Sequence, residues 1–332
     1  MLKIIEDFPR QWQEGWMLGE KQSFPLPAHL SNIIFLGMGG SATAGDILKT
    51  IGEECCPIPL EVNRNYSLPA WVGPQTLALA FSYSGNTRET LTAMEKARSQ
   101  GARVWSISSG GIMEENPGDR HLKIPGGLPP RGALGYMLAP VLAIFNQEGF
   151  LLTSREEREE VQKELERIRG ENGGVEGAAG PAGLLAEKLK GRIPLILGGD
   201  KWGEVAARRW KCQFNENSKT PSFAGSYPEL NHNEMAGWEV PPDIKDIFCI
   251  IQLQDNLLPA PIKKRMEITG EFFQERGIPV HVIPGQAHSL LARLLSFIYF
   301  GDYVSYYLAR LYKVDPQPVR VIEDFKKKLE TN

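Results

Sequence analysis

The strongest indication of the fold comes from the stretch Phe81-Ser82-Tyr83-Ser84-Gly85-Asn86-Thr87-Arg88-Glu89-Thr90. This stretch follows an apolar run, residues 76–81, and opens a segment with helical periodicity, residues 90–99. We therefore expect a buried strand to turn into a helix here. The free N–H groups and the positive dipole end of a helix N-terminus favour an anion. Hydroxyl side chains at such a turn predict a phosphate site built from neutral donors.

Strand-like and helix-like runs alternate along the rest of the chain, which is typical of a parallel sheet wrapped by helices. In the first half, strands are predicted at 32–36, 58–62, 76–81, 104–107 and 121–124, and helices at 42–51, 90–99 and 134–148. In the second half, strands are predicted at 193–197, 247–253 and 280–283, and helices at 203–215, 263–275 and 289–312. The pattern predicts an α/β protein with two similar domains, each an αβα sandwich.

The middle of the chain predicts the domain boundary. Ser154 and Glu157 have the spacing of a capping box at the start of a charged helix that runs to about Arg169. A glycine-dense stretch follows at 170–181 and is interpreted as a linker or mobile loop. We therefore assign 1–152 to an N-terminal domain, 153–185 to a helix and linker, and 186–332 to a C-terminal domain.

Composition excludes several classes of function. The 332 residues carry a formal net charge of -3, so no general affinity for nucleic acid or for anionic membranes is expected. No apolar run reaches the roughly 18 residues that a membrane span needs. The N-terminal octet lacks a signal-peptide layout, and the four cysteines show no CxxC spacing, so reduced thiols in the cytoplasm are predicted. The five histidines form no HxH or HExxH pair, and no metal site is expected.

A glycine-rich corner, Leu36-Gly37-Met38-Gly39-Gly40-Ser41-Ala42, joins the first predicted strand to its helix. Glycines at such a corner let backbone N–H groups approach an anion closely. Gly37, Gly39 and Ala42 also fit a dinucleotide fingerprint loosely, with Glu61 near the distance expected for a ribose contact. A further alternative is that the glycines only allow tight packing of the strand against the helix.

The two turns together are more specific than either alone. A strand, Gly-Gly-Ser and a helix, followed by a strand, Ser-x-Ser-Gly-x-Thr and a helix, resemble the sugar isomerase (SIS) fold, in which both loops grip one phosphate. A single serine- or threonine-rich turn would more often be a helix N-cap. The resemblance implies two SIS-type domains and a phosphate site formed by Gly40, Ser41, Ser82, Ser84 and Thr87.

A second group of polar residues follows the first predicted helix of the C-terminal domain. It comprises Phe214-Asn215-Glu216-Asn217-Ser218-Lys219-Thr220-Pro221 and Pro228-Glu229-Leu230-Asn231-His232-Asn233-Glu234. Carboxylates, a histidine and amides so close in sequence, in loops after a helix, supply the parts for proton transfer. A carboxylate can act as the base, and an imidazole can donate or accept a proton near neutral pH.

The motifs occur in one order: Gly-Gly-Ser, Ser-x-Ser-Gly-Asn-Thr, Pro-Arg-Gly, Asn-Glu-Asn-x-Lys and Pro-Glu-Leu-x-His-Asn-Glu. This ordered set resembles the bifunctional phosphoglucose/phosphomannose isomerases over nearly the whole chain. The resemblance implies that Glu216 moves a proton between C1 and C2 of the open-chain sugar and that His232 helps to open the ring. It also implies that Arg131 stabilises the enediolate and that a C-terminal lysine assists, for which Lys326 fits best and Lys327 and Lys313 remain open.

The chemistry of aldose–ketose isomerisation agrees with these residue types. It needs a positioned base and a cation beside the oxygen where charge develops, and guanidinium stays charged and offers a planar fork of donors. The expected function is interconversion of glucose 6-phosphate, and of mannose 6-phosphate, with fructose 6-phosphate in glycolysis and gluconeogenesis. A homodimer without metal or redox cofactor is expected. The alternatives are a non-catalytic SIS protein that binds a sugar phosphate and regulates a partner, and an NAD-dependent oxidoreductase.

Overall fold

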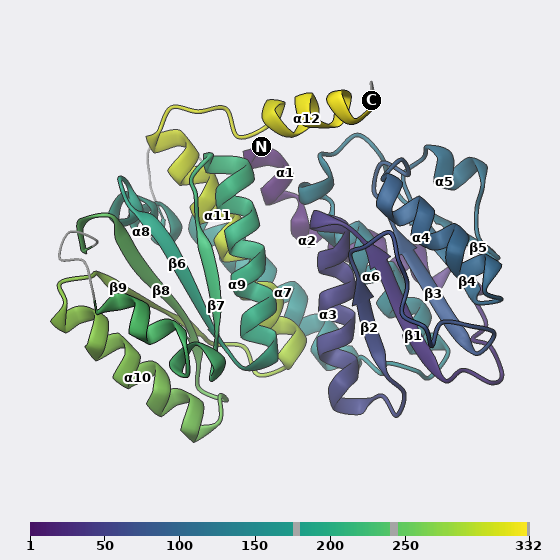
Figure 1. Ribbon diagram of the computed structural model, residues 1–332, viewed down its shortest axis with the longest axis horizontal. Helices are drawn as coiled ribbons and strands as arrows, with labels where there is room; N and C mark the ends of the chain where they lie inside the picture. The colour runs from purple at the N-terminus through teal and green to yellow at the C-terminus, as the bar shows by residue number, and fades with distance from the viewer. Residues whose placement is uncertain (175–179, 240–244, 331–332) are drawn as a thin grey trace. The chain divides into compact units, whose positions relative to one another are not determined.

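The computed structural model describes residues 1–174, 180–239 and 245–330, and it contains two compact units. One unit comprises Glu6–Glu166 with His288–Ala292, and the other comprises Met1–Ile5, Arg167–Ala287 and Arg293–Asn332. Each unit has its own parallel sheet flanked by helices (Figure 1). The predicted α/β class with two such domains is therefore confirmed. None of the helices within the described ranges is long and apolar enough to cross a bilayer.

The first unit is built on a five-stranded sheet of order β2-β1-β3-β4-β5, in which all pairs are parallel. The strands are β1 (Asn32–Gly37), β2 (Leu60–Asn63), β3 (Thr76–Phe81), β4 (Arg103–Ser108) and β5 (Arg120–Lys123). Every residue of β3 is buried, which explains its continuous apolar run. The helices and the 3₁₀ turn of this part of the chain are α2 (Phe8–Glu20), α3 (Gly39–Cys55), α4 (Arg88–Ser99), α5 (Ile112–Glu115), η1 (Pro130–Gly132), α6 (Leu134–Gln147) and α7 (Arg155–Asn172).

Helix α2 was absent from the sequence prediction, and its glycines explain how it fits. It lies against α6, so closely that a Cβ atom at Gly19 would come within 2.3 Å of the Pro140 carbonyl oxygen. The capping box at the start of α7 is confirmed, because Ser154 and Glu157 exchange side-chain-to-backbone hydrogen bonds of 2.9 and 3.1 Å. The two units divide within α7. Residues 175–179 of the glycine-dense stretch lie outside the described residues, and α8 (Pro181–Leu189) follows.

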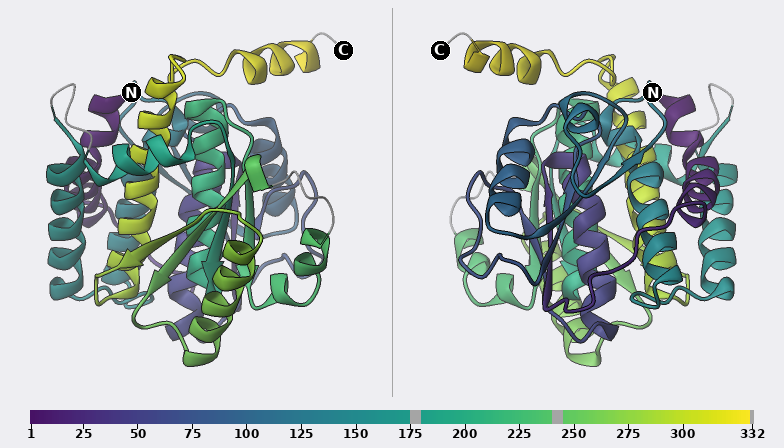
Figure 2. Two further views of the ribbon diagram at one scale, coloured as in Figure 1. Left: turned by 90° about the vertical axis from the view of Figure 1, so that its left-hand side faces the viewer. Right: turned by 90° about the vertical axis from the view of Figure 1, so that its right-hand side faces the viewer.

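The second unit is built on a four-stranded parallel sheet of order β7-β6-β8-β9. The strands are β6 (Ile193–Gly199), β7 (Phe223–Tyr227), β8 (Phe248–Asp255) and β9 (Val280–Gly285). The helices and turns named from this part of the chain are α1 (Leu2–Glu6), α9 (Asp200–Gln213), η2 (Phe214–Ser218), η3 (Glu229–Asn231), η4 (Glu234–Trp238), α10 (Ala260–Glu275), α11 (Leu290–Leu311) and α12 (Arg320–Glu330). Helices α9 and α10 cover opposite faces of the sheet (Figure 1 and Figure 2).

Aromatic side chains of α9 and α11 form the core on one side of this sheet. Trp210, Tyr299 and Tyr303 are among the largest fully buried side chains, and the Trp210 indole N–H donates to the Phe297 carbonyl oxygen over 2.7 Å. Most of the aromatic side chains of α11 therefore lie in the core of the chain.

Candidate functional site

The two predicted phosphate loops meet in the first unit. They follow β1 and β3, which are neighbours in the sheet and end in register at Gly37 and Phe81. The backbone N–H of Tyr83 donates to the Ser41 hydroxyl oxygen over 3.2 Å, so a hydrogen bond joins the second loop directly to the first. The expected juxtaposition of these loops is present, at the carboxyl edge of a parallel sheet where ligands of α/β proteins bind.

The hydroxyl groups of the second loop differ in exposure. Ser82 is completely buried, and its hydroxyl donates to Thr87 Oγ1 over 3.0 Å and accepts from the Thr87 N–H over 3.4 Å. Ser84 is exposed, and its hydroxyl accepts from the Asn86 N–H over 3.3 Å. Thr87 immediately precedes α4 and is partly exposed. Ser82 thus holds the start of α4 in place, while Ser84 and Thr87 are open to a ligand.

Two glycines set the shape of these loops. Gly85 has φ +71°, and a Cβ atom there would lie 1.8 Å from the Gly110 carbonyl oxygen. A Cβ atom at Gly40 would lie 3.1 Å from Arg131 Cα. The absence of a side chain at Gly40 therefore lets the backbone of the predicted enediolate-binding arginine approach the first phosphate loop.

Tyr83 ties the phosphate loops to the segment that carries Arg131. Its hydroxyl donates to the Pro125 carbonyl oxygen and accepts from the Leu128 N–H, both over 3.0 Å. Burial raises the pKa of the Tyr83 hydroxyl above its ordinary value, so it remains a neutral donor. Beyond this segment, the buried Gln11 side chain donates to the Gly132 carbonyl oxygen over 2.9 Å. Arg131 itself is only 4% exposed.

Glu216 lies in the second unit, on a π-helical turn, η2, that continues α9. The N–H groups of Lys219 and Thr220 and the hydroxyl of Ser218 all donate to the Phe214 carbonyl oxygen. Such widened turns occur frequently at functional sites. The Glu216 side chain is partly exposed. Burial is the main cause that raises the pKa of the nearby Cys212 thiol, and the Glu216 carboxylate raises it further.

A buried polar network anchors this turn to α11. Asp302 accepts from Arg209 Nη2 over 3.2 Å and from Gln213 Nε2 over 2.7 Å. Asn217, beside Glu216, donates to the Ser305 hydroxyl over 2.9 Å. Because α11 carries both acceptors, the turn that carries Glu216 is fixed to a long buried helix.

We expect Asp302→Ala to destabilise the protein by about 3–5 kcal/mol, because the substitution leaves the Arg209 charge buried without its carboxylate. Arg209 and Asp302 side chains are only 2% and 10% exposed. Equilibrium unfolding in urea measures the effect. Glu204→Ala is the matched control, since it breaks the exposed Arg208–Glu204 pair on the same helix and should change stability by about 0.5 kcal/mol or less. Equal effects of the two substitutions would contradict the anchoring role.

His232 follows η3, after strand β7, and is exposed. Its segment is attached to α10, because Asn231 Nδ2 donates to Thr269 Oγ1 over 2.9 Å. The Trp238 ring also packs edge-on against Phe273 of α10, with ring centroids 5.0 Å apart. The histidine therefore belongs to the side of the sheet that α10 covers.

The sequence prediction placed Glu216 and His232 in neighbouring loops after one helix, and this arrangement is wrong. Strand β7 lies between them in sequence, and the prediction missed it. Glu216 continues α9, whereas the His232 segment is tied to α10, on the opposite face of the sheet (Figure 1). The two residues keep their predicted roles as hypotheses, but proximity in sequence does not bring them together.

The candidate lysines lie near the end of the chain. Lys326 and Lys327 are exposed on α12, and Lys313 lies two residues after the end of α11 in a left-handed conformation with φ +57°. Lys219 Nζ donates to the carbonyl oxygens of Glu216 and Pro318, over 2.5 and 2.7 Å. The tail that leads into α12 is thus joined to the turn that carries Glu216.

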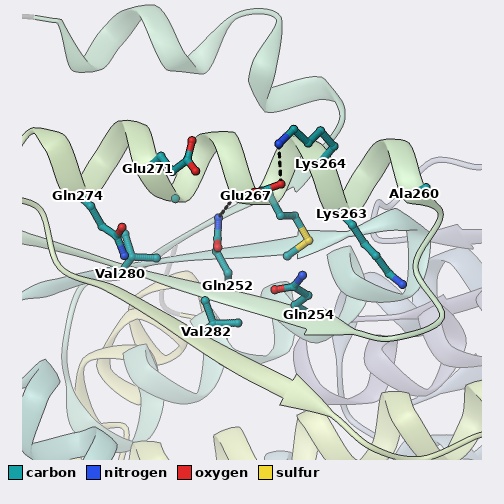
Figure 3. A pocket seen from close by; sticks show the side chains of 12 residues that line it. Gln252, Gln254, Ala260, Lys263, Lys264, Glu267, Glu271, Gln274, Val280 and Val282 are labelled. Carbon is teal, nitrogen blue, oxygen red and sulfur yellow. Dashed lines mark hydrogen bonds and ion pairs between the residues drawn. The ribbon is translucent and has the colours of Figure 1, made fainter.

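A separate cavity of about 550 Å³ lies between α10 and the strands β8 and β9, and none of the predicted site residues lines it (Figure 3). Lysine and glutamate side chains both line this cavity, and Lys264 forms an ion pair of 2.8 Å with Glu267. This mixture does not offer the concentrated donors that a phosphate requires. Among the residues that the structure describes, no group of three or more His, Cys, Asp or Glu side chains could hold a metal ion.

Comparison with known proteins decides the family. Residues 28–126 match the SIS domain family, and residues 178–329 match the bacterial phospho-glucose isomerase C-terminal SIS domain family. A bifunctional phosphoglucose/phosphomannose isomerase of Caldicellulosiruptor bescii is 39% identical, over 99% of this chain and 98% of its own. The chain belongs to the bifunctional phosphoglucose/phosphomannose isomerase family.

Further members of the bifunctional phosphoglucose/phosphomannose isomerase family give the same result. The protein of that name from Aquifex aeolicus is 32% identical, over 99% of this chain and 98% of its own. Among solved structures, the C-terminal domain of glucosamine-fructose-6-phosphate aminotransferase from Francisella tularensis matches with a TM-score of 0.72 at 17% identity. That match covers 96% of this chain and 97% of the other, and at this identity it shows the shared fold alone.

Proposed function

We propose that this protein interconverts glucose 6-phosphate, and also mannose 6-phosphate, with fructose 6-phosphate. The observation that carries the proposal is its full-length similarity to proteins named bifunctional phosphoglucose/phosphomannose isomerase. Hydroxyl groups at two adjacent strand ends and a carboxylate on a π-helical turn that continues α9 support it. We place the reaction in glycolysis and gluconeogenesis in the cytoplasm.

The phosphate end of the substrate is assigned to the joined loops of the first unit. Ser41, Ser84 and Thr87 supply hydroxyl groups, and the Gly40 backbone and the first turn of α4 supply N–H groups. The buried Ser82 positions Thr87 through the hydrogen bond between their hydroxyl groups. Holding the phosphate away from the reacting carbons lets binding energy orient the sugar.

The proposed chemistry uses Glu216 as the base and Arg131 as the cation. With the ring open, the Glu216 carboxylate takes the C2 proton of the aldose, a C1–C2 double bond forms, and the C1 carbonyl oxygen becomes an enediolate oxygen. Arg131 stabilises that charge, and the proton of the C2 hydroxyl passes to the C1 oxygen. Glu216 returns its proton to C1 as the C2 oxygen becomes the ketone oxygen. Lys326 assists from the C-terminal tail. Because the enediolate is planar at C2, one site can accept both C2 epimers.

Glu216 and the segment of His232 belong to opposite faces of the sheet of the second unit. We therefore place His232 in the active site of a second copy of this chain. Within one chain, the sheet of the second unit separates the turn after α9 from the segment attached to α10. A twofold dimer would let each chain supply its exposed histidine to its partner's site. The homodimer and the shared site are therefore parts of the same proposal.

A hybrid dimer tests the shared site. Glu216→Gln and His232→Ala homodimers are each expected to lose about 10²-fold or more in kcat. A hybrid that carries one substitution on each chain, purified through two different affinity tags, should regain about half of the wild-type activity, because one of its two sites is then intact. A hybrid as inactive as its parents would show that each chain completes its own site.

Turnover of fructose 6-phosphate tests the function as a whole. Formation of glucose 6-phosphate, followed through glucose-6-phosphate dehydrogenase in a coupled assay, is the expected result. Binding of fructose 6-phosphate without turnover would instead support the non-catalytic SIS protein. A change in NADH fluorescence on addition of the protein, without sugar turnover, would support the oxidoreductase.

A further inference from the structure

Lys219 has an unusual backbone conformation at the end of the turn that carries Glu216. It is one of three non-glycine residues with positive φ among those that the structure describes, at φ +57° and ψ +28°. Non-glycine residues in this left-handed region are uncommon and strained, and they cluster at functional sites. The conformation ends the π-helical turn and allows the side chain to fold back over it.

The ammonium group of Lys219 connects two segments that lie 99 residues apart. Its Nζ atom donates to the Glu216 carbonyl oxygen over 2.5 Å and to the Pro318 carbonyl oxygen over 2.7 Å. Carbonyl groups in the last turn of a helix lack partners within the helix, and a cation is favourable there. The first acceptor is the backbone carbonyl group of Glu216, so the Lys219 ammonium group contacts the backbone of the proposed base directly.

The second acceptor lies in a stiff part of the tail. Pro316 and Pro318 flank Gln317, whose N–H donates to the Asp315 carboxylate over 2.9 Å. Proline fixes φ, so a contact at Pro318 limits the directions in which the following chain can leave. Helix α12, which carries Lys326, begins only two residues later, at Arg320.

We propose that Lys219 is a positioning residue that fixes the Glu216 turn and the Lys326-bearing tail relative to each other. This inference rests on the proposed isomerase function. The Lys219 side chain acts through two backbone carbonyl groups, so its loss should displace the base and the tail without removing either reacting group. Catalysis is sensitive to such displacement, since misplacement by about 1 Å can cost about 10²-fold in rate.

Kinetics of Lys219→Met and Lys219→Arg test the proposal. Lys219→Met should lower kcat by about 10–100-fold and leave the KM for fructose 6-phosphate within about twofold, because the phosphate loops lie in the other unit. Lys219→Arg should restore most of kcat, since its planar fork can reach two acceptors. Lys263→Met is the matched control, because Lys263 Nζ also donates to a backbone carbonyl, that of Asn256, over 2.5 Å. An unchanged kcat in Lys219→Met, or equal losses in the two Met variants, would overturn the proposal.

Hydrogen exchange gives a readout that is independent of turnover. In Lys219→Met, backbone amides over residues 319–323 should exchange faster than in the wild type, whereas Lys263→Met should leave them unchanged. Unaltered exchange there would overturn the link to the tail. A wild-type protein without isomerase activity would refute the proposed function, and the exchange measurement would still decide whether Lys219 holds the tail.

Discussion

Glu216→Gln is expected to lower kcat by about 10²–10⁴-fold, because the amide has nearly the shape of the carboxylate but cannot take the proton from C2. The KM for fructose 6-phosphate should change little, since the phosphate loops belong to the other unit. The buried contacts of Asn217 and Gln213 with α11 should also hold the turn in place in the variant. Steady-state kinetics with fructose 6-phosphate gives both parameters.

Glu204→Gln is the control for this experiment. Glu204 is an exposed carboxylate on α9, the helix that leads into the Glu216 turn, and its partner is Arg208 at 2.6 Å. The same chemical change at this position should leave kcat unaltered. A Glu216→Gln protein with kcat within about twofold of the wild type would remove Glu216 from the reaction.

Arg131→Met is expected to lower kcat by about 10²–10³-fold, because the developing enediolate charge loses the cation that stabilises it. Arg131 is buried, and its backbone packs against Gly40 of the first phosphate loop. The substitution could therefore act through stability as well as through catalysis. A kinetic constant alone would not separate the two effects.

Binding of a phosphorylated hydroxamate, as a mimic of the enediolate, separates them. Loss of a group that acts in the transition state should weaken binding of the mimic far more than it raises the KM for fructose 6-phosphate. Arg131→Lys should lie between the wild type and Arg131→Met, because it keeps a charge but not the planar fork. Equal weakening of substrate and mimic would assign Arg131 to general substrate binding or to the structure of the loop.

The strands and helices around the two loops of the first unit could be predicted because the sequence patterns that indicate them are local. A continuous apolar run predicted β3, and the hydroxyl-rich turn after it predicted the start of α4, both of which the structure confirms. The pairing of β1 with β3 then brought the two loops together. The fold class and the juxtaposition of the two loops therefore followed from short stretches of sequence.

Strand β7 was not predictable in the same way. Its sequence, Phe-Ala-Gly-Ser-Tyr, is short and contains glycine, and Phe223 is 52% exposed. The strand exists because β6 supplies its hydrogen bonds, from Leu195 opposite Phe223 to Gly199 opposite Tyr227. Missing it put Glu216 and His232 in loops after the same helix, although the chain crosses to the other face of the sheet between them. The Lys219 contact with Pro318 depends on tertiary structure as well, and no local pattern indicates it.

Incubation with fructose 6-phosphate in D₂O, followed by ¹H NMR, tests the central claim most directly. An enediolate formed by Glu216 predicts glucose 6-phosphate and mannose 6-phosphate that carry deuterium at C2, with Glu216→Gln forming neither at a comparable rate. Absence of both aldose phosphates from the wild-type reaction, or equal rates in the two proteins, would contradict the account.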